Sequence, residues 1–175
     1  MRASIVIRSK NEERMIGVVL EKLFAQEFAN PYEVMVLDSG SQDRTLDIVR
    51  RFPARLETIT PQQFTFGFAL NHGARLAQGR YVVFLSAHCV PRERTWLADL
   101  LYPLDAEPEV AATYGCQEPF PGVNPFEELE LARSFGSFNG TAVRAHFSNA
   151  NSAVRREILA RHPFDEQVAM GEDFL

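Results

Sequence analysis

The sequence predicts an α/β domain built around a mostly parallel β-sheet. Four apolar runs, rich in β-branched and aromatic residues, have the length of strands: residues 4–8, 33–37, 55–59 and 81–85. The segments between them carry apolar residues at helical spacing, and turn signals separate the elements at Asn30-Pro31, Ser39-Gly40-Ser41 and Gln78-Gly79. A β-α-β-α-β-α-β order with right-handed crossovers follows, which makes neighbouring strands parallel and flanks the sheet with helices.

Apolar stripes on two of the connecting helices predict which helix faces enter the core. The stripe on the first helix consists of Ile16, Val19, Leu20, Leu23 and Phe24. The stripe after residues 81–85 consists of Leu97, Leu100, Leu101 and Leu104. Beyond residue 105 the pattern loosens into a proline-rich loop over 118–125, a short helix over 126–135, and a strand that passes into a helix within 146–156.

Length, composition and charge limit the class of protein. With 175 residues, 46% of them hydrophobic, the chain is expected to form one globular domain over 1–175. A formal net charge of −5 argues against non-specific nucleic-acid binding and favours a small ligand. No stretch has the pattern of a signal peptide or the length of a membrane span, so we expect a cytoplasmic domain. Cys89 and Cys116 are expected to be free, buried thiols without metal-ligand spacing.

Several common enzyme classes are excluded by the motifs that are absent. There is no G-x-G-x-x-G after a strand, no Walker phosphate loop, no G-x-S-x-G elbow and no H-E-x-x-H. Dehydrogenase, P-loop, hydrolase and zinc-protease functions are therefore not expected.

Polar side chains follow two of the predicted strands where those strands end. Asp38 closes the second strand, and Ser86 and His88 follow the fourth. In open α/β sheets ligands bind outside the carboxyl ends of the strands, so these side chains should reach one crevice where a nucleotide would lie. Asp38 would accept hydrogen bonds from the ligand. His88 is either a structural histidine or a ligand of a divalent ion, since imidazole can bind a cation through one nitrogen while the other is held by an acceptor.

Two further polar segments are candidates for the same site. The exit of the first strand, from Arg8 to Glu13, supplies cations; alternatively it is a solvated loop in which Asn11 caps a helix and Glu12 favours its dipole. Both roles are compatible with the same residues. Near the end of the chain, Glu172-Asp173 is either an exposed acidic pair or the source of a carboxylate that takes a proton from an attacking hydroxyl.

Taken together, these blocks resemble the inverting glycosyltransferases of family 2, which have the GT-A fold. Residues 5–13 are similar to the family's first strand and N-E turn, and residues 36–45 to its V-D-x-G-S-x-D-x-T block. Asn71 to Gly79 matches the N-x-G-x-x-x-A-x-G helix, and Glu172-Asp173 falls at the E-D motif. The segments 114–119 and 147–153 look like the rhamnosyltransferase-like branch.

The resemblance implies roles for the candidate residues. A nucleoside-diphosphate sugar would contact Arg8, Asn11, Glu12, Asp38 and Ser86, with Asp38 on the base or ribose. Asp173, with Glu172 beside it, would be the catalytic base. Residues 1–105 would form the nucleotide-binding half and residues 106–175 the acceptor-side half. Because the chain ends directly after the acidic pair, we expect a fragment that lacks the C-terminal part of the enzyme.

Two departures from the family pattern affect the diphosphate site. The family's D-x-D motif, which binds a divalent cation, is replaced by Ser86-Ala87-His88, so both acids are missing. His88 can still ligate Mn²⁺, whereas Mg²⁺ prefers oxygen ligands, and the implied cofactor is therefore Mn²⁺ or Mg²⁺ at this position. Leu70 stands where related members have an arginine, so Arg8, Lys10 or Arg75 would have to replace that diphosphate contact.

The expected reaction is a single in-line displacement on the donor sugar, with a glycan or lipid-linked acceptor, in polysaccharide biosynthesis. Peripheral association with the inner face of the membrane would fit such acceptors. A sugar-nucleotide-forming nucleotidyltransferase would need a glycine-rich loop after the first strand, which residues 8–13 lack. The remaining alternative is a catalytically degenerate domain that binds a nucleotide or a partner, for which the altered Ser86-Ala87-His88 is the argument.

Overall fold

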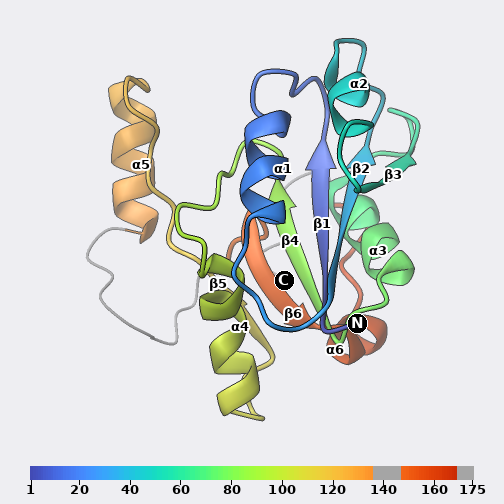
Figure 1. Cartoon of the computed structure of the whole chain (residues 1–175), viewed down its shortest axis with the longest axis vertical. Coiled ribbons are helices and arrows are strands. Elements are labelled where there is room, and N and C mark those ends of the chain that lie inside the picture. Colours follow the sequence, from blue (N-terminus) through green and yellow to red (C-terminus); the bar gives the residue numbers. More distant parts are fainter. Residues whose placement is uncertain (136–146, 169–175) are drawn as a thin grey trace.

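The protein folds around a six-stranded sheet, as seen in a computed structural model that describes residues 1–135 and 147–168 (Figure 1). The strands are β1 (Ala3–Ser9), β2 (Tyr32–Asp38), β3 (Arg55–Thr58), β4 (Tyr81–Ser86), β5 (Ala112–Tyr114) and β6 (Asn151–Arg155). The helices are α1 (Ile16–Phe24), α2 (Thr45–Val49), α3 (Phe66–Leu76), α4 (Trp96–Ala106), α5 (Pro125–Phe135) and α6 (Arg156–Arg161). The predicted strands, turns and later helices are all present, with boundaries shifted by a residue or two.

The sheet is mostly parallel, as predicted. Its order is β3-β2-β1-β4-β6-β5; β1 pairs in parallel with both β2 and β4, whereas β6 runs antiparallel to β4 and to β5. The carboxyl ends of β1, β2 and β4 therefore meet at one edge, which is the upper edge in Figure 1. The two strands that were expected to end in polar side chains, β2 and β4, therefore lie on either side of β1 and end at the same edge.

Both faces of the sheet are covered by helices, because the strands are apolar on both sides. The buried stripes of α1 and α4 pack on one face, against side chains such as Ile5 and Val83. Leu70 of α3 and Leu159 of α6 pack on the other face, against Val6. The predicted core stripes are confirmed except for Phe24, which is only partly buried at the rim of the first cluster.

Close contacts with β1 explain the glycines of the α3 block. A Cβ at Gly73 would lie 2.4 Å from Cγ1 of Val6, and a Cβ at Gly79 would lie 2.5 Å from the carbonyl carbon of Ala3. The amide of Gly79 also donates to the buried hydroxyl of Ser4 at 2.8 Å. These glycines let α3 and the turn into β4 approach β1 closely, so that part of the motif is architectural.

The helices and the two cysteines can be compared with what the sequence predicts. Within residues 1–135 and 147–168, no helix has both the length and the apolar character needed to cross a bilayer.

Both thiols are free of disulfides, as predicted, but only Cys89 is largely covered, and the expectation that Cys116 is buried is wrong. Cys116 lies on the loop after β5 and is exposed, with its Sγ 3.7 Å from the carbonyl oxygen of Phe135 at the end of α5.

Candidate functional site

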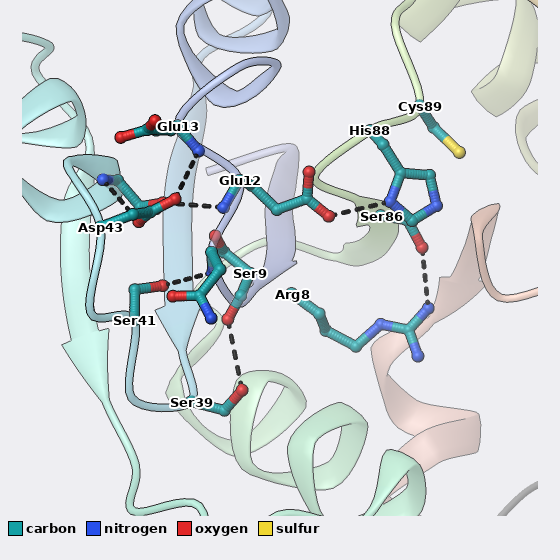
Figure 2. Close-up of polar contacts among 12 residues, drawn as sticks. Arg8, Ser9, Glu12, Glu13, Ser39, Ser41, Asp43, Ser86, His88 and Cys89 are labelled. Carbon is teal, nitrogen blue, oxygen red and sulfur yellow. Dashed lines mark hydrogen bonds and ion pairs between the residues drawn. The ribbon is translucent and has the colours of Figure 1, made fainter.

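The candidate site lies where β1, β2 and β4 end. In the sheet register, Arg8 is opposite Ser86 on one side of β1, and Ser9 is opposite Asp38 on the other. Figure 2 shows the side chains that follow these strand ends, from Asp43 across to His88. The sheet therefore brings together the first-strand loop, the second-strand turn and the fourth-strand exit, as the sequence predicted.

The carboxylate of Asp38 is fully buried and is used by its own turn. Its Oδ1 accepts hydrogen bonds from the backbone amides of Gly40 at 2.9 Å and Ser41 at 2.8 Å, and its Oδ2 accepts one from the Ser41 hydroxyl. This is the arrangement by which an aspartate shapes a tight turn, and Gly40 supplies the positive φ of 92° that the turn requires. A direct nucleotide contact by Asp38 stays a prediction.

The loops after β1 and β2 are joined by hydrogen bonds from three successive backbone amides. The amide of Asn11 donates to Oγ of Ser41 at 2.7 Å, and the amide of Glu12 donates to Oγ1 of Thr45 at 2.8 Å. The amide of Glu13 donates to Oδ2 of Asp43 at 3.1 Å. The polar residues of the second-strand block therefore hold the first-strand loop, a role that the sequence analysis did not find.

The conformation of Asn11 differs from the one expected for a helix cap. Its φ is +54°, in the left-handed region, and its Oδ1 accepts from the amide of Gln42 at 2.8 Å. Helix α1 begins only at Ile16, after Met15, which makes no side-chain cap. The predicted capping role of Asn11 is wrong, because the residue turns the chain towards the neighbouring loop instead.

Electrostatics reinforce this junction between the loops. Burial opposes ionisation of Asp43, but hydrogen bonds from the side chain and amide of Thr45 and from the amide of Glu13 together lower the pKa of that carboxyl. The pKa of Glu13 is also lowered, chiefly by the backbone and side-chain hydrogen bonds of Arg44. Both carboxylates are thus held ionised where they accept hydrogen bonds.

Glu12 and His88 meet across the ends of β1 and β4. Oε1 of Glu12 lies 3.1 Å from Nδ1 of His88, although the residues are 76 positions apart in sequence (Figure 2). The Glu12 side chain is 24% exposed and the His88 side chain 62% exposed. The sequence predicts both residues at this edge but not the contact between them.

The guanidinium of Arg8 supplies positive charge to the same edge. It donates to Oγ of Ser86 at 3.4 Å and to the carbonyl oxygen of Asn149 at 3.1 Å, and it lies 5.4 Å from the centre of the Phe66 ring. Arg8 therefore connects β1, β4, the start of α3 and the segment before β6. Leu70, where relatives were expected to carry an arginine, is fully buried against the sheet.

A cavity of about 480 Å³ opens beside His88. Trp96 and Phe120 contribute aromatic surface to it, and Gln117 and Asn151 contribute amide groups. Cys89 also lines it, and burial raises the pKa of that thiol to about 11. Asp38 is not among the residues that line this cavity, and a pocket shared by Asp38 and His88 stays a prediction.

On the opposite face, Asn71 holds the segment that leads towards the acidic pair. Its Oδ1 accepts from the amide of Phe164 at 3.0 Å, and its Nδ2 donates at 2.9 Å to the carbonyl oxygen of Phe164 and to Oε1 of Glu166. A Cβ at Gly67 would lie 2.2 Å from the carbonyl oxygen of Asp165, so the segment presses directly on α3. The predicted base, Glu172-Asp173, lies outside the described residues.

At this edge, His88 could contribute one ligand to a cation whose other ligands come from a bound donor. No group of three or more His, Cys, Asp or Glu side chains within the described ranges could enclose a metal ion. Nδ1 of His88, however, contacts the carboxylate of Glu12, and the ring is largely exposed. In metal sites, a histidine with one nitrogen bonded to a carboxylate commonly binds the metal through its other nitrogen. Cations in phosphate-binding sites commonly take their other ligands from the substrate and from water.

Known proteins resemble this chain in sequence. The profile of the family described as glycosyl transferase family 2 matches residues 4–162. The O-antigen chain rhamnosyltransferase WbaN of Salmonella anatum is 26% identical over 162 residues, which cover 86% of this chain and 51% of that protein. The chondroitin synthase of Escherichia coli is 31% identical over 112 residues, which cover 62% of this chain and 16% of that protein. The chain therefore spans about half or less of the length of these relatives.

Solved structures share the fold. The mannosyltransferase PcManGT of Pyrobaculum calidifontis, in complex with GDP-Man and Mn²⁺, superposes with a TM-score of 0.73 at 27% identity, over 98% of this chain and 49% of that one. TarS 1-349 of S. aureus in complex with UDP-GlcNAc superposes with a TM-score of 0.72 at 20% identity, over 100% of this chain and 52% of that one. The predicted GT-A fold is confirmed. With the family profile covering most of its length, the chain belongs to glycosyl transferase family 2.

Proposed function

We propose that this chain forms the donor-binding and catalytic part of an inverting glycosyltransferase. The enzyme transfers a sugar from a nucleoside-diphosphate sugar to an acceptor hydroxyl. The observation that carries the proposal is the grouping of Arg8, Glu12, Ser86 and His88 at the carboxyl edge of β1 and β4, in a chain of this family. It is supported by PcManGT, which shares the fold and binds GDP-Man and Mn²⁺.

The donor's diphosphate lies against Arg8 and His88 in this proposal. Arg8 is oriented by Ser86 and by the Asn149 carbonyl, and its fixed charge opposes the negative charge that develops on the leaving group. A divalent cation held by His88 and the diphosphate would stabilise the same charge. The nucleoside rests on Asp38 and the turn that it holds, with Asn11 and Glu12 on the neighbouring loop.

The reaction is a single displacement with inversion at the anomeric carbon. Asp173 takes the proton from the acceptor hydroxyl while that oxygen forms a bond to the anomeric carbon. The bond from that carbon to the diphosphate oxygen breaks, and its electron pair leaves with the nucleoside diphosphate. Glu172 lies beside the base in sequence, and the segment before both is fixed to α3 by Asn71.

The acceptor enters the cavity beside His88. That cavity adjoins the diphosphate edge and offers both aromatic rings and amide groups, a combination suited to a sugar. The names of the relatives include an O-antigen chain rhamnosyltransferase and a chondroitin synthase. We therefore infer that the acceptor is a glycan or a lipid-linked acceptor.

Calorimetry with UDP, GDP and dTDP, each with and without Mn²⁺, tests donor binding and identifies the base. Asp173→Asn should abolish transfer and leave nucleotide affinity almost unchanged. Equal loss of transfer and of nucleotide binding would contradict the assignment of the base. Binding of a nucleotide without transfer to any acceptor or to water would favour a catalytically degenerate binding domain, for which the altered Ser86-Ala87-His88 is the reason.

A further inference from the structure

We propose that Glu12 is a positioning residue that holds His88 in the tautomer protonated on Nδ1, so that the lone pair of Nε2 faces a divalent cation. This inference rests on the proposed function, since it concerns the cation of the same site. The sequence predicts that Glu12 contacts the nucleotide or favours the start of a helix. The structure adds a contact that was not predicted, with Oε1 of Glu12 at 3.1 Å from Nδ1 of His88.

The tautomer follows from the chemistry of this contact. An ionised carboxylate can only accept hydrogen bonds, so a hydrogen bond between Glu12 and Nδ1 of His88 requires a proton on Nδ1. In a neutral imidazole the other nitrogen then carries a lone pair and no proton. Figure 2 shows that second nitrogen on the side of the ring away from Glu12. The pair therefore has the carboxylate–histidine arrangement that orients metal-bound imidazoles.

The orientation of His88 depends on a partner, because packing supplies little of it. The ring is 62% exposed and follows β4 in a short turn, in which the amide of Cys89 donates to the carbonyl oxygen of Ser86. An exposed ring in such a turn samples several rotamers unless a hydrogen bond selects one. The hydrogen bond with the Glu12 carboxylate favours one rotamer of the His88 ring.

Glu12 is itself fixed before any ligand arrives. Its amide is bonded to Oγ1 of Thr45, and the amides on either side of it, of Asn11 and Glu13, are bonded to Ser41 and Asp43. The left-handed conformation of Asn11, with a φ of +54°, directs the chain into this set of bonds. The β2–α2 loop thus fixes the Glu12 backbone. The Glu12 side chain, held in this way, orients the His88 ring through its hydrogen bond to Nδ1.

The tautomer can be read in the metal-free protein. Long-range ¹H–¹⁵N spectra of the chain labelled on histidine, with the His88 signals assigned by His88→Gln, report which ring nitrogen carries the proton. We expect the Nδ1–H form in the wild type and in the control Glu13→Ala, which removes the adjacent carboxylate that binds Arg44. We expect the Nε2–H form to become dominant in Glu12→Ala.

Mn²⁺ alone, added to the same samples, tests the consequence for metal binding. Broadening of the His88 signals should require about 10- to 100-fold more Mn²⁺ in Glu12→Ala than in the wild type, and no such increase in Glu13→Ala. An Nε2–H form in the wild type, or an equal effect of the two variants on Mn²⁺ broadening, would overturn the proposal. Neither the tautomer measurement nor the Mn²⁺ titration needs a sugar donor or an acceptor substrate. A failure of sugar transfer would therefore count against the proposed function and not against the role of Glu12.

Discussion

The side-chain amide of Asn71 pairs with both backbone polar groups of Phe164. Its Oδ1 accepts from the amide at 3.0 Å and its Nδ2 donates to the carbonyl oxygen at 2.9 Å, across 93 positions of sequence. Asn71 is 4% exposed, so these bonds are shielded from water. The motif residue on α3 thereby anchors the chain shortly before the acidic pair that we propose as the base.

Asn71→Ala should therefore impair catalysis more than donor binding. Leaving the part-buried backbone groups of Phe164 without these hydrogen bonds costs about 1–3 kcal/mol of unfolding free energy, which a urea titration measures. Donor hydrolysis should fall while nucleotide affinity by calorimetry stays within about twofold of wild type, a difference of under about 0.5 kcal/mol. Asn71→Asp keeps the acceptor but replaces the donor with a second acceptor that faces the Phe164 carbonyl and the Glu166 carboxylate, so its loss should be at least as large as that of Asn71→Ala. A catalytic rate unchanged in both variants would contradict the anchoring role.

Thr45→Val should loosen the junction between the first two loops. The substitution keeps the shape of a fully buried side chain but removes the oxygen that accepts from the amide of Glu12. We expect a loss of about 1–3 kcal/mol in unfolding free energy, because that amide becomes unsatisfied. Thr45→Ser restores the hydroxyl and should recover most of the loss; if it does not, packing rather than the hydrogen bond stabilises the junction.

Arg8→Ala should reduce kcat/KM for donor hydrolysis by about 10²- to 10³-fold, the effect typical of losing one donor that stabilises developing charge. The matched control is Arg50→Ala, which removes the same charge from an exposed ion pair with Asp47 on α2. Steady-state kinetics on the donor identified by calorimetry provide the measurement. An equal effect of the two substitutions would show that Arg8 acts only through the net charge of the chain.

The chemistry of Cys89 should depend on pH in a defined direction. Burial raises the pKa of its thiol from 9.0 to about 11, so the neutral form is favoured in the folded chain. This contribution to stability is complete below about pH 9 and is lost as the pH rises towards 11.

Alkylation of the variant Cys116→Ser, in which Cys89 is the remaining thiol, measures that pKa. At pH 8 on the order of a thousandth of the Cys89 thiol is ionised, so the reaction should be slow and should accelerate about tenfold for each pH unit. The rate should level off only near pH 11. A plateau near pH 9 would show that Cys89 is not buried in solution.

The order of the elements and the core stripes were fixed by the sequence alone. Strands β1, β2 and β4 and the buried faces of α1 and α4 follow from apolar periods of two and of 3.6 residues, which are local properties of the chain. The same patterns identified the polar residues at the strand ends, including Asp38, Ser86 and His88.

Only the tertiary structure decided what those polar residues bind. Asp38 accepts hydrogen bonds from amides of its own turn. Ser41 and Thr45 accept hydrogen bonds from a loop about 30 positions earlier, and Glu12 contacts His88 across 76 positions. A hydrogen bond forms only over about 3 Å, so it depends on the register between strands and on the path of each turn. Residue types in a motif carry no such information, so the sequence predicted which residues lie at the strand ends while the fold determined their hydrogen-bond partners.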